Sequence, residues 1–362
     1  MNADVRRPPG QLEPLRLNIP EAAWQRLRLR LGRSWATGEA LDVALAYGVS
    51  PGELGQLLDY WLNEFDFAEQ PLTELPCFEL GGDRPQSFVH LRSAEASALP
   101  LLLLHGYSGS LAEFTNLLPA LVEPRAHGAS PGAAFHAVCP SLPGFGLSAA
   151  VPCARAAAEQ LAALMAQLGY SRYLVHGSDL GASVALELAA LDDAHVAAVH
   201  VTSLAAYPAE DPFELAGLSA PEKSRLAGLA ELRDRLLFQL PEAPLAALGF
   251  ALSQLDTEAL DAAESLSWRD ALLAGLSLTW AFAAPTARND FYRDSAFVPA
   301  TPSRVPVALH AFPLAAPSLR RFAERAHHVV EWIEYPHGGG MPALDAPNAL
   351  LGSLRACFAR CR

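Results

Sequence analysis

The chain has 362 residues, of which 51% are hydrophobic, and its formal net charge is −13. A chain of this size and composition can bury the core of one elaborated α/β domain or of two closely packed domains. The acidic balance argues against nucleic acid or an anionic membrane as a partner.

Cysteine and lysine usage narrows the chemistry further. The five cysteines are an odd number without metal-ligand spacing, and Lys223 is the single lysine. This usage indicates a reducing cytoplasm and excludes most Schiff-base mechanisms. The N-terminus lacks an apolar signal segment and no run of 18 apolar residues occurs, so we expect a cytoplasmic protein without a membrane span. Monomer and homodimer both remain open.

We expect neither a metal nor a cofactor. His327 and His328 are adjacent, so on a helix or strand they would point away from each other and would not share a metal ion. The Gly144-Phe-Gly146 stretch lacks the third glycine and the helix start of a dinucleotide fingerprint.

The first hundred residues predict helices that are followed by strands. The predicted elements are an extended segment at 15–20, helices at 20–31 and 51–65, a hairpin at 77–92 and a fully buried strand at 99–104.

Strands then alternate with helices until residue 203, and the β pattern resumes at residue 305. Strands are expected at 135–139, 173–176, 196–201, 305–310 and 329–334, and helices at 154–169, from residue 180, and at 346–360. The alternation predicts a mostly parallel, doubly wound sheet. Residues 205–297 show helical periodicity instead, so we expect them to form a lid over the carboxyl ends of the strands, where open α/β sheets bind ligands.

The stretch around Asp179 predicts a strand, a sharp turn and an Ala-rich helix. Gly177-Ser178-Asp179-Leu180-Gly181 has the glycine–x–nucleophile–x–glycine spacing of a nucleophile elbow. Small flanking residues allow a strained turn that lifts one side chain clear of the sheet. A carboxylate in that position attacks an electrophilic carbon, which suits epoxides or alkyl halides better than amides. The alternative is an Asp that caps the following helix.

Several separated stretches share their order and spacing with one family. They are Tyr47-Gly48 through Trp61, Phe65-Asp-Phe67, His105-Gly-Tyr-Ser-Gly-Ser110 with Glu113-Phe114, the loop from Pro140 to Ser148, and the elbow. Together they resemble the α/β-hydrolase-fold epoxide hydrolases with an extra N-terminal segment, as in the microsomal and juvenile-hormone enzymes.

The resemblance covers nearly the whole chain and implies an α/β-hydrolase fold. Its sheet is expected to be eight-stranded and mostly parallel, with a helical lid and an N-terminal segment that wraps around both. The implied organisation is an N-terminal segment at 1–95, a first core part at 96–204, the lid at 205–297 and a second core part at 298–362.

The resemblance also implies roles for individual residues. Asp179 would be the nucleophile, and the backbone N–H groups of Tyr107 and Leu180 would stabilise an oxyanion. Tyr292 in the lid would donate a hydrogen bond to the departing epoxide oxygen. Without the resemblance, we would interpret Tyr107 as an apolar residue that lines a pocket.

Four further residues are candidates for contact with a substrate. His105 and Ser178 flank the expected oxyanion hole and nucleophile, although His105-Gly106 also reads as an ordinary turn at the end of a strand. Trp280 and Phe282 suit a pocket for a polycyclic aromatic ligand, and they equally suit lid packing.

This chain lacks the catalytic His, the relay acid and one of the two lid tyrosines that the family is expected to have. Gly340 stands where the family has its catalytic His, and Ala315 stands where the relay acid is expected. Arg235 aligns with one of the two lid tyrosines, whereas Tyr292 matches the other. His337 could take the vacated role if its loop were rebuilt, but it also reads as a plain loop residue after a strand.

These departures predict a protein that does not hydrolyse epoxides efficiently. The first hypothesis is an enzyme that catalyses epoxide opening, cyclisation or C–C bond formation on a bulky hydrophobic natural product of polyketide or enediyne type. The second is a working epoxide hydrolase that uses Asp179 and His337. The third is a catalytically silent protein that binds a hydrophobic ligand.

Overall fold

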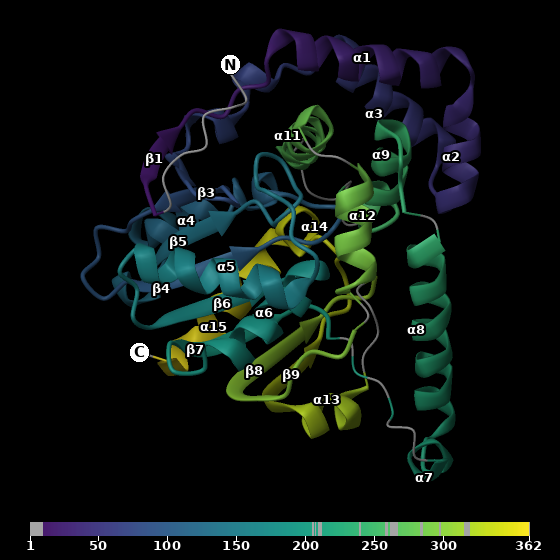
Figure 1. Ribbon diagram of the computed structural model, residues 1–362. Helices are drawn as coiled ribbons and strands as arrows, with labels where there is room; N and C mark the ends of the chain where they lie inside the picture. The colour runs from purple at the N-terminus through teal and green to yellow at the C-terminus, as the bar shows by residue number, and fades with distance from the viewer. Residues whose placement is uncertain are drawn as a thin grey trace.

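The computed structural model describes residues 10–361 except 205, 207, 209–211, 239, 258–259, 261–266, 283–284, 297 and 315–318. The described residues form one sheet of nine strands in the order β1-β2-β3-β5-β4-β6-β7-β8-β9, with helices on both faces (Figure 1). The strands are β1 (Leu12–Leu15), β2 (Cys77–Leu80), β3 (Gln86–Leu91), β4 (Leu99–Leu104), β5 (Phe135–Pro140), β6 (Tyr173–Gly177), β7 (Val196–Val201), β8 (Ser303–Ala311) and β9 (His327–Glu334).

The sheet is mostly parallel, as predicted. The pairs β1–β2, β2–β3 and β3–β5 are antiparallel, and the remaining five neighbouring pairs are parallel. The central strands are buried on both faces, which is why strand β4 ends in four consecutive leucines, Leu101 to Leu104, that are all 0% exposed.

The expected strand count of eight is wrong, because β1 is an additional edge strand. Leu12 to Leu15 pair with β2 in register from Leu12–Leu80 to Leu15–Cys77, ahead of the extended segment predicted at 15–20. Four residues are too few to show a strand periodicity, and this edge is held by backbone hydrogen bonds to β2 rather than by a distinctive side-chain pattern.

Two hydrophobic clusters occupy the two faces of the sheet. Helices α5 (Ala154–Gln167) and α6 (Leu180–Leu191) contribute to one cluster, and α4 (Leu118–Val122) and α15 (Pro347–Phe358) contribute to the other (Figure 1). Every residue of α6 from Leu180 to Ala189 is buried, and all of them except Ser183 and Glu187 are apolar or glycine, as expected for a helix packed beneath other elements.

Three N-terminal helices form a layer that packs against the helices between β7 and β8, the region expected to be the lid, rather than a detached domain. They are α1 (Glu21–Ala36), α2 (Glu39–Tyr47) and α3 (Pro51–Asn63). The buried indole of Trp61 in α3 donates a hydrogen bond to Ser277 Oγ in lid helix α11 (Ser267–Phe282) at 2.9 Å.

The N-terminal helices differ in part from the prediction. Helix α1 continues past residue 31 to Ala36, and α2 was not predicted. Only Val43 and Ala44 of α2 are buried, whereas Leu41 and Leu45 are exposed, so its sequence shows no clear apolar stripe.

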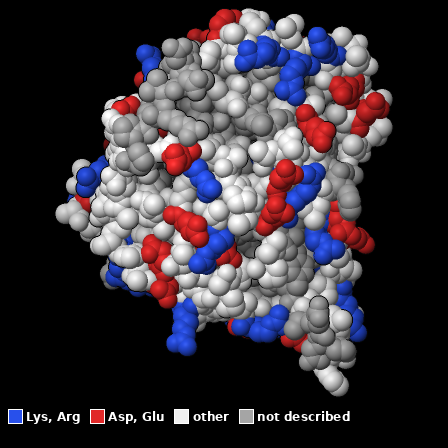
Figure 2. Space-filling view, in the orientation of Figure 1, with Lys and Arg blue, Asp and Glu red and all other residues white. Residues whose placement is uncertain are grey.

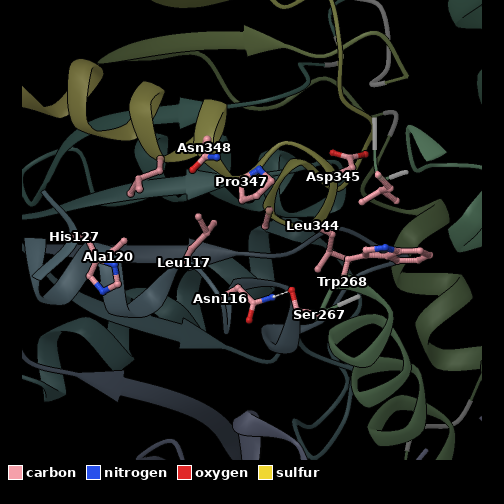
Figure 3. A pocket seen from close by; sticks show the side chains of 13 residues that line it. Asn116, Leu117, Ala120, His127, Ser267, Trp268, Leu344, Asp345, Pro347 and Asn348 are labelled. Atoms are coloured by element: carbon pink, nitrogen blue, oxygen red, sulfur yellow. Dashed lines mark hydrogen bonds between the residues drawn. The ribbon is translucent and has the colours of Figure 1, made fainter. Parts of the chain in front are cut away.

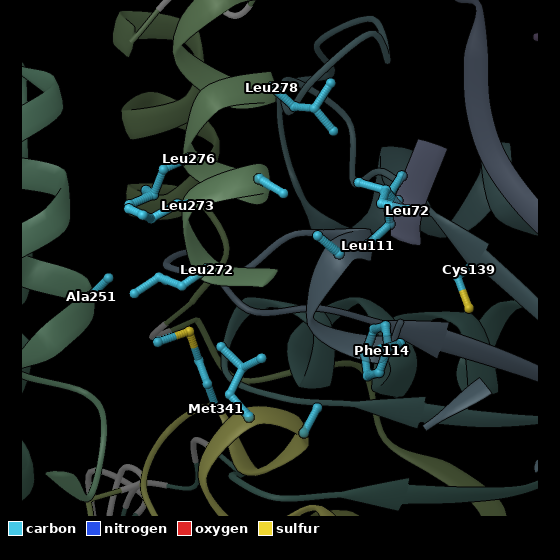
Figure 4. Close-up of a cluster of buried hydrophobic side chains, with 14 of the residues drawn as sticks. Leu72, Leu111, Phe114, Cys139, Ala251, Leu272, Leu273, Leu276, Leu278 and Met341 are labelled. Atoms are coloured by element: carbon cyan, nitrogen blue, oxygen red, sulfur yellow. The ribbon is translucent and has the colours of Figure 1, made fainter. Parts of the chain in front are cut away.

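The described elements between β7 and β8 are helical. They are α7 (Pro212–Ala216), α8 (Ala220–Phe238), α9 (Pro244–Leu252), α11 and α12 (Pro285–Arg293). Leu272, Leu273 and Leu276 of α11 point toward Ala251 of α9 (Figure 4). Helix α11 also approaches the core closely, since a Cβ on Gly275 would lie 2.3 Å from Ser110 Oγ and 3.8 Å from the Cβ of Ala112. This contact joins the lid to the short helix η3 (Leu111–Phe114), which follows the end of strand β4.

The other α-helices of the described residues are α13 (Arg320–Ala326), which follows β8, and α14 (Pro342–Asp345), which follows β9. Acidic and basic side chains are interspersed over the face of the molecule shown in Figure 2. None of the described helices combines the length and the apolar character needed to cross a bilayer.

Candidate functional site

The turn between β6 and α6 presents Asp179 in a strained conformation. Asp179 has φ 47° and ψ −117°, and it is the one described non-glycine residue with positive φ. A Cβ on Gly177 would lie 2.3 Å from Gly181 O, and a Cβ on Gly181 would lie 2.4 Å from Leu104 O. Both glycines are therefore required by close backbone approach, and the turn has the geometry of a nucleophile elbow.

The two carboxylate oxygens of Asp179 have different partners. The Tyr107 N–H donates to Oδ2 at 2.9 Å, and the Tyr292 hydroxyl donates to Oδ1 at 3.3 Å. Burial raises the pKa of Asp179 above its ordinary value, while hydrogen bonds from the Tyr107 and Leu180 backbones and from Tyr292 act in the opposite direction. Oδ2 of Asp179 is thus held by a backbone N–H group, and Oδ1 faces Tyr292 of α12.

The loop after β4 is held in place by His105. Because the Leu142 N–H donates to Nε2 at 2.9 Å, the proton lies on Nδ1, which donates to Gly106 O at 2.8 Å. Burial lowers the pKa of His105 to about 4, so the ring is neutral. With both ring nitrogens bonded to backbone and no exposed surface, His105 orients the loop, and its direct contact with a substrate stays a prediction.

Ser178 is also withdrawn from the surface. Its side chain is 1% exposed, and its Oγ lies 3.5 Å from His176 Nε2. A substrate contact through Ser178 stays a prediction, because Tyr292, which lies beside Asp179, is equally buried at 1%.

Helix α12 of the lid carries the residues above Asp179. The ring centroids of Tyr107 and Tyr292 are 4.6 Å apart, and the Tyr107 hydroxyl donates to Asn289 Oδ1 at 2.5 Å. The guanidinium of Arg288 lies 5.0 Å from the Tyr107 ring centroid. The sequence analysis did not single out Arg288 or Asn289. Asn289 is the first residue of the stretch that identified Tyr292, and Arg288 immediately precedes it.

The two aromatic candidates, Trp280 and Phe282, differ in their burial. Trp280 is buried, and the guanidinium groups of Arg30 and Arg288 lie 5.0 and 4.9 Å from its ring centroid. Phe282 is half-buried and packs against the larger hydrophobic cluster. Arg235 belongs to α8, but its side chain lies outside the described part of the structure.

The loop that contains Gly340 is bound to the turn after α9. The Gly340 N–H donates to Gln254 O at 2.7 Å, and a Cβ on Gly340 would lie 3.4 Å from Gln254 Oε1. A Cβ on Gly339 would lie only 2.2 Å from Gln254 O. His337 is exposed on the same loop, and position 315 lies outside the described residues.

Two buried carboxyl groups near the site were not predicted. Glu113 is 1% exposed, and burial, with a smaller effect from the charge of Asp179, raises its pKa well above the ordinary value. Burial raises the pKa of Asp345 to about 7, and its Oδ2 accepts the Asp256 N–H at 3.0 Å. The Ser110-x-x-Glu113 spacing is a capping-box signal that would have identified Glu113 as a structural residue of η3.

A cavity lies beside α14 and the start of α15. It has a volume of about 420 Å³, and Asp345, Trp268 and Leu344 lie along one side of it (Figure 3). Asn116 and Ser267 join across it through a hydrogen bond of 3.2 Å. Among the described residues, no group of three or more His, Cys, Asp and Glu side chains is arranged to hold a metal ion.

Comparison with known families matches both parts of the chain. Residues 12–114 match the model described as epoxide hydrolase N terminus, and residues 100–289 match the model of the alpha/beta hydrolase fold. A putative epoxide hydrolase of Stigmatella aurantiaca is 31% identical over 97% of this chain and 86% of its own length. Epoxide hydrolase 1 of Oryctolagus cuniculus is 29% identical over 52% of this chain, and the match spans 44% of that protein.

Solved structures show the same architecture. The structure of Aspergillus niger epoxide hydrolase has a TM-score of 0.75 and 25% identity, with 97% of this chain and 96% of that chain covered. Juvenile hormone epoxide hydrolase from the silkworm Bombyx mori gives a TM-score of 0.70 at 22% identity, over 97% and 94% of the two chains. The predicted α/β-hydrolase fold is confirmed.

Proposed function

Because this chain belongs to the epoxide hydrolase family of the α/β-hydrolase fold, we propose that it opens an epoxide without completing a hydrolytic cycle. The substrate is a bulky hydrophobic natural product, and the product arises by cyclisation or C–C bond formation. The observation that carries this proposal is that the Asp179 carboxylate is bonded to Tyr107 and Tyr292, while glycine occupies position 340.

The contact between Asp179 and Tyr292 supports a closed proton cycle. A hydroxyl or acidic C–H of the substrate loses its proton to Asp179 Oδ1 as its oxygen or carbon attacks the epoxide carbon. The epoxide C–O bond breaks, and Tyr292 protonates the departing oxygen. Because the Tyr292 hydroxyl lies 3.3 Å from Asp179 Oδ1, the carboxyl proton then returns to the phenolate, and neither residue needs an activated water.

Hydrolysis by the family's route, through an ester on Asp179, would require a further base that this site lacks at position 340. General-base activation contributes about 10²- to 10⁴-fold, and the members of a catalytic triad act as a unit. His337 is exposed, which does not favour its substitution for the missing histidine. We therefore expect little or no diol from a simple epoxide such as styrene oxide, and rapid diol formation that is lost in His337→Ala would establish the hydrolase alternative.

An aryl-substituted 4,5-epoxy alcohol tests the proposal, because its internal hydroxyl can replace water. We expect a cyclic ether with inversion at the attacked carbon. Asp179→Asn should slow the reaction more than Tyr292→Phe, since loss of one hydrogen-bond donor typically costs about 10²- to 10³-fold at most.

Intact-protein mass spectrometry distinguishes base catalysis from covalent catalysis. Base catalysis leaves the protein mass unchanged, whereas a nucleophilic Asp179 gives net retention and a stoichiometric adduct that disappears in Asp179→Asn. If neither Asp179→Asn nor Tyr292→Phe slows product formation, the pocket is only a binding site and the proposed chemistry is wrong.

A further inference from the structure

Arg288 is a buried cation beside the reacting residues. Its side chain is 2% exposed, and its guanidinium lies 5.0 Å from the Tyr107 ring centroid and 4.9 Å from that of Trp280. Arg288 precedes Tyr292 by four residues in α12, so the two side chains share one face of the helix. The charge therefore lies about one helical turn from the tyrosine that contacts Asp179.

The described residues provide this cation with no acidic partner. Its Nη2 donates to Pro241 O at a long 3.5 Å, its guanidinium is hydrogen-bonded to the neutral Tyr107 side chain, and its Nε has no hydrogen-bond partner. A buried charge is normally paired with an opposite charge, because neutral contacts only partly replace its lost hydration. The neighbouring aromatic rings attract the guanidinium by cation–π interaction, but they offer no hydrogen-bond acceptor to its Nε.

We infer that Arg288 recognises an anionic oxygen group of the substrate, either a carboxylate or an ionised enol or phenol. This inference rests on the proposed function, since it takes Asp179 and Tyr292 as the reacting end of the site. A planar guanidinium donates two parallel hydrogen bonds to such a group.

The spacing along α12 restricts where that group stands in the substrate. Residues four apart on a helix have Cβ atoms about 5–6 Å apart, so the anionic group lies a few bonds from the carbon that reacts. Trp280 and Phe145 provide apolar surface around the same guanidinium. The substrate is thus a hydrophobic scaffold with an acidic oxygen close to its epoxide.

Arg288 could instead serve only as a stacking spacer between aromatic rings of the lid. The two roles predict different ligand preferences, because a spacer does not distinguish an anionic ligand from a neutral ligand of the same shape.

Two unreactive probes, 2-naphthoate and 2-naphthamide, separate these roles by isothermal titration calorimetry. A charge-assisted bond to buried Arg288 should make 2-naphthoate bind about 10- to 100-fold tighter than the amide. Arg288→Met should remove this preference and retain binding of the amide. Arg30→Met is the matched control, since Arg30 contacts the same Trp280 ring from an exposed position, and it should leave the preference intact.

Arg288→Lys covers the case in which Arg288→Met does not fold, because lysine keeps the charge and should retain part of the preference. Equal affinity for the two probes, binding of neither, or a preference that survives in Arg288→Met overturns the inference. Binding of these probes requires no chemistry at Asp179. A preference that depends on Arg288 would therefore stand even if the epoxy alcohol were not cyclised.

Discussion

The protonation state of Asp179 depends on opposing influences within a few ångströms. Burial favours the neutral acid and raises the pKa, whereas the hydrogen bonds from two backbone N–H groups and from Tyr292 favour the carboxylate. A base must be ionised before it can accept a proton. The tyrosine therefore has two effects, since it donates to the substrate oxygen and keeps Asp179 ionised to lower pH.

Tyr292→Phe should move the acid limb of the pH–rate profile upward. Loss of a bond that lowers the Asp179 pKa raises that pKa, so activity disappears at a higher pH than in the wild type. The measurement is kcat/KM for the epoxy alcohol as a function of pH. Tyr170→Phe, which removes a hydroxyl bonded to His90, is the control, and an acid limb that stays in place in Tyr292→Phe would contradict the assignment.

At the scale of elements, the elbow exists because β6, α6 and β4 approach one another closely. Gly181→Ala would place a Cβ 2.4 Å from Leu104 O and 2.6 Å from His105 O, so backbone would have to move. We expect this substitution to destabilise the protein by about 3 kcal/mol. Gly352→Ala in α15 is the matched control, because a Cβ there has no neighbour within 4 Å. It should stabilise the protein by about 0.5–1 kcal/mol, and urea unfolding measures both.

The contact between α3 and α11 attaches the N-terminal layer to the lid. Trp61 is 0% exposed, and Trp61→Ala should destabilise the protein by about 3–5 kcal/mol through the cavity that it creates. Trp35→Ala is the comparison, because Trp35 is 49% exposed and its loss should change stability by about 0.5 kcal/mol or less. Equal midpoints in urea for the two variants would show that the layer is not held by this contact.

At the scale of the whole molecule, three buried histidines cross the sheet side by side. His176 Nδ1 and His200 Nδ1 are 3.0 Å apart, and the ring centroids of His200 and His310 are 4.6 Å apart. Burial lowers the pKa of each ring, and that of His176 falls to about 3. These rings remain neutral in the folded protein where the unfolded chain, with a His pKa of about 6.5, takes up protons.

His176→Gln should flatten the pH dependence of stability. Below pH 6 the unfolded wild type binds about one more proton at this position than the folded protein, so stability falls by about 1.4 kcal/mol for each pH unit lost. The raised pKa values of Glu113 and Asp345 act in the opposite direction, but they are common to both proteins and cancel in the comparison. Urea unfolding between pH 6 and 4.5 measures the slope, and His127→Gln, at an exposed position, should keep the wild-type slope.

The sequence by itself determined those features that are encoded by neighbouring residues. Four consecutive leucines ended a strand that had to be buried on both faces, and two glycines around Asp179 required a close turn. The alternation of such strands with apolar helices restricted the fold to a parallel sheet. Each of these signals is local, since periodicity and backbone freedom depend on a few adjacent positions.

The tertiary structure alone decided which distant residues meet. Leu12 to Leu15 became a strand only through pairing with β2, and Gln254 came to lie beside Gly340 across 86 positions of the chain. Arg288 and Glu113 are charged residues that their own sequence context does not mark as buried, yet both are almost fully enclosed. Their environment depends on packing between separate elements. That packing raises the pKa of Glu113 and leaves the Nε of Arg288 without a hydrogen-bond partner.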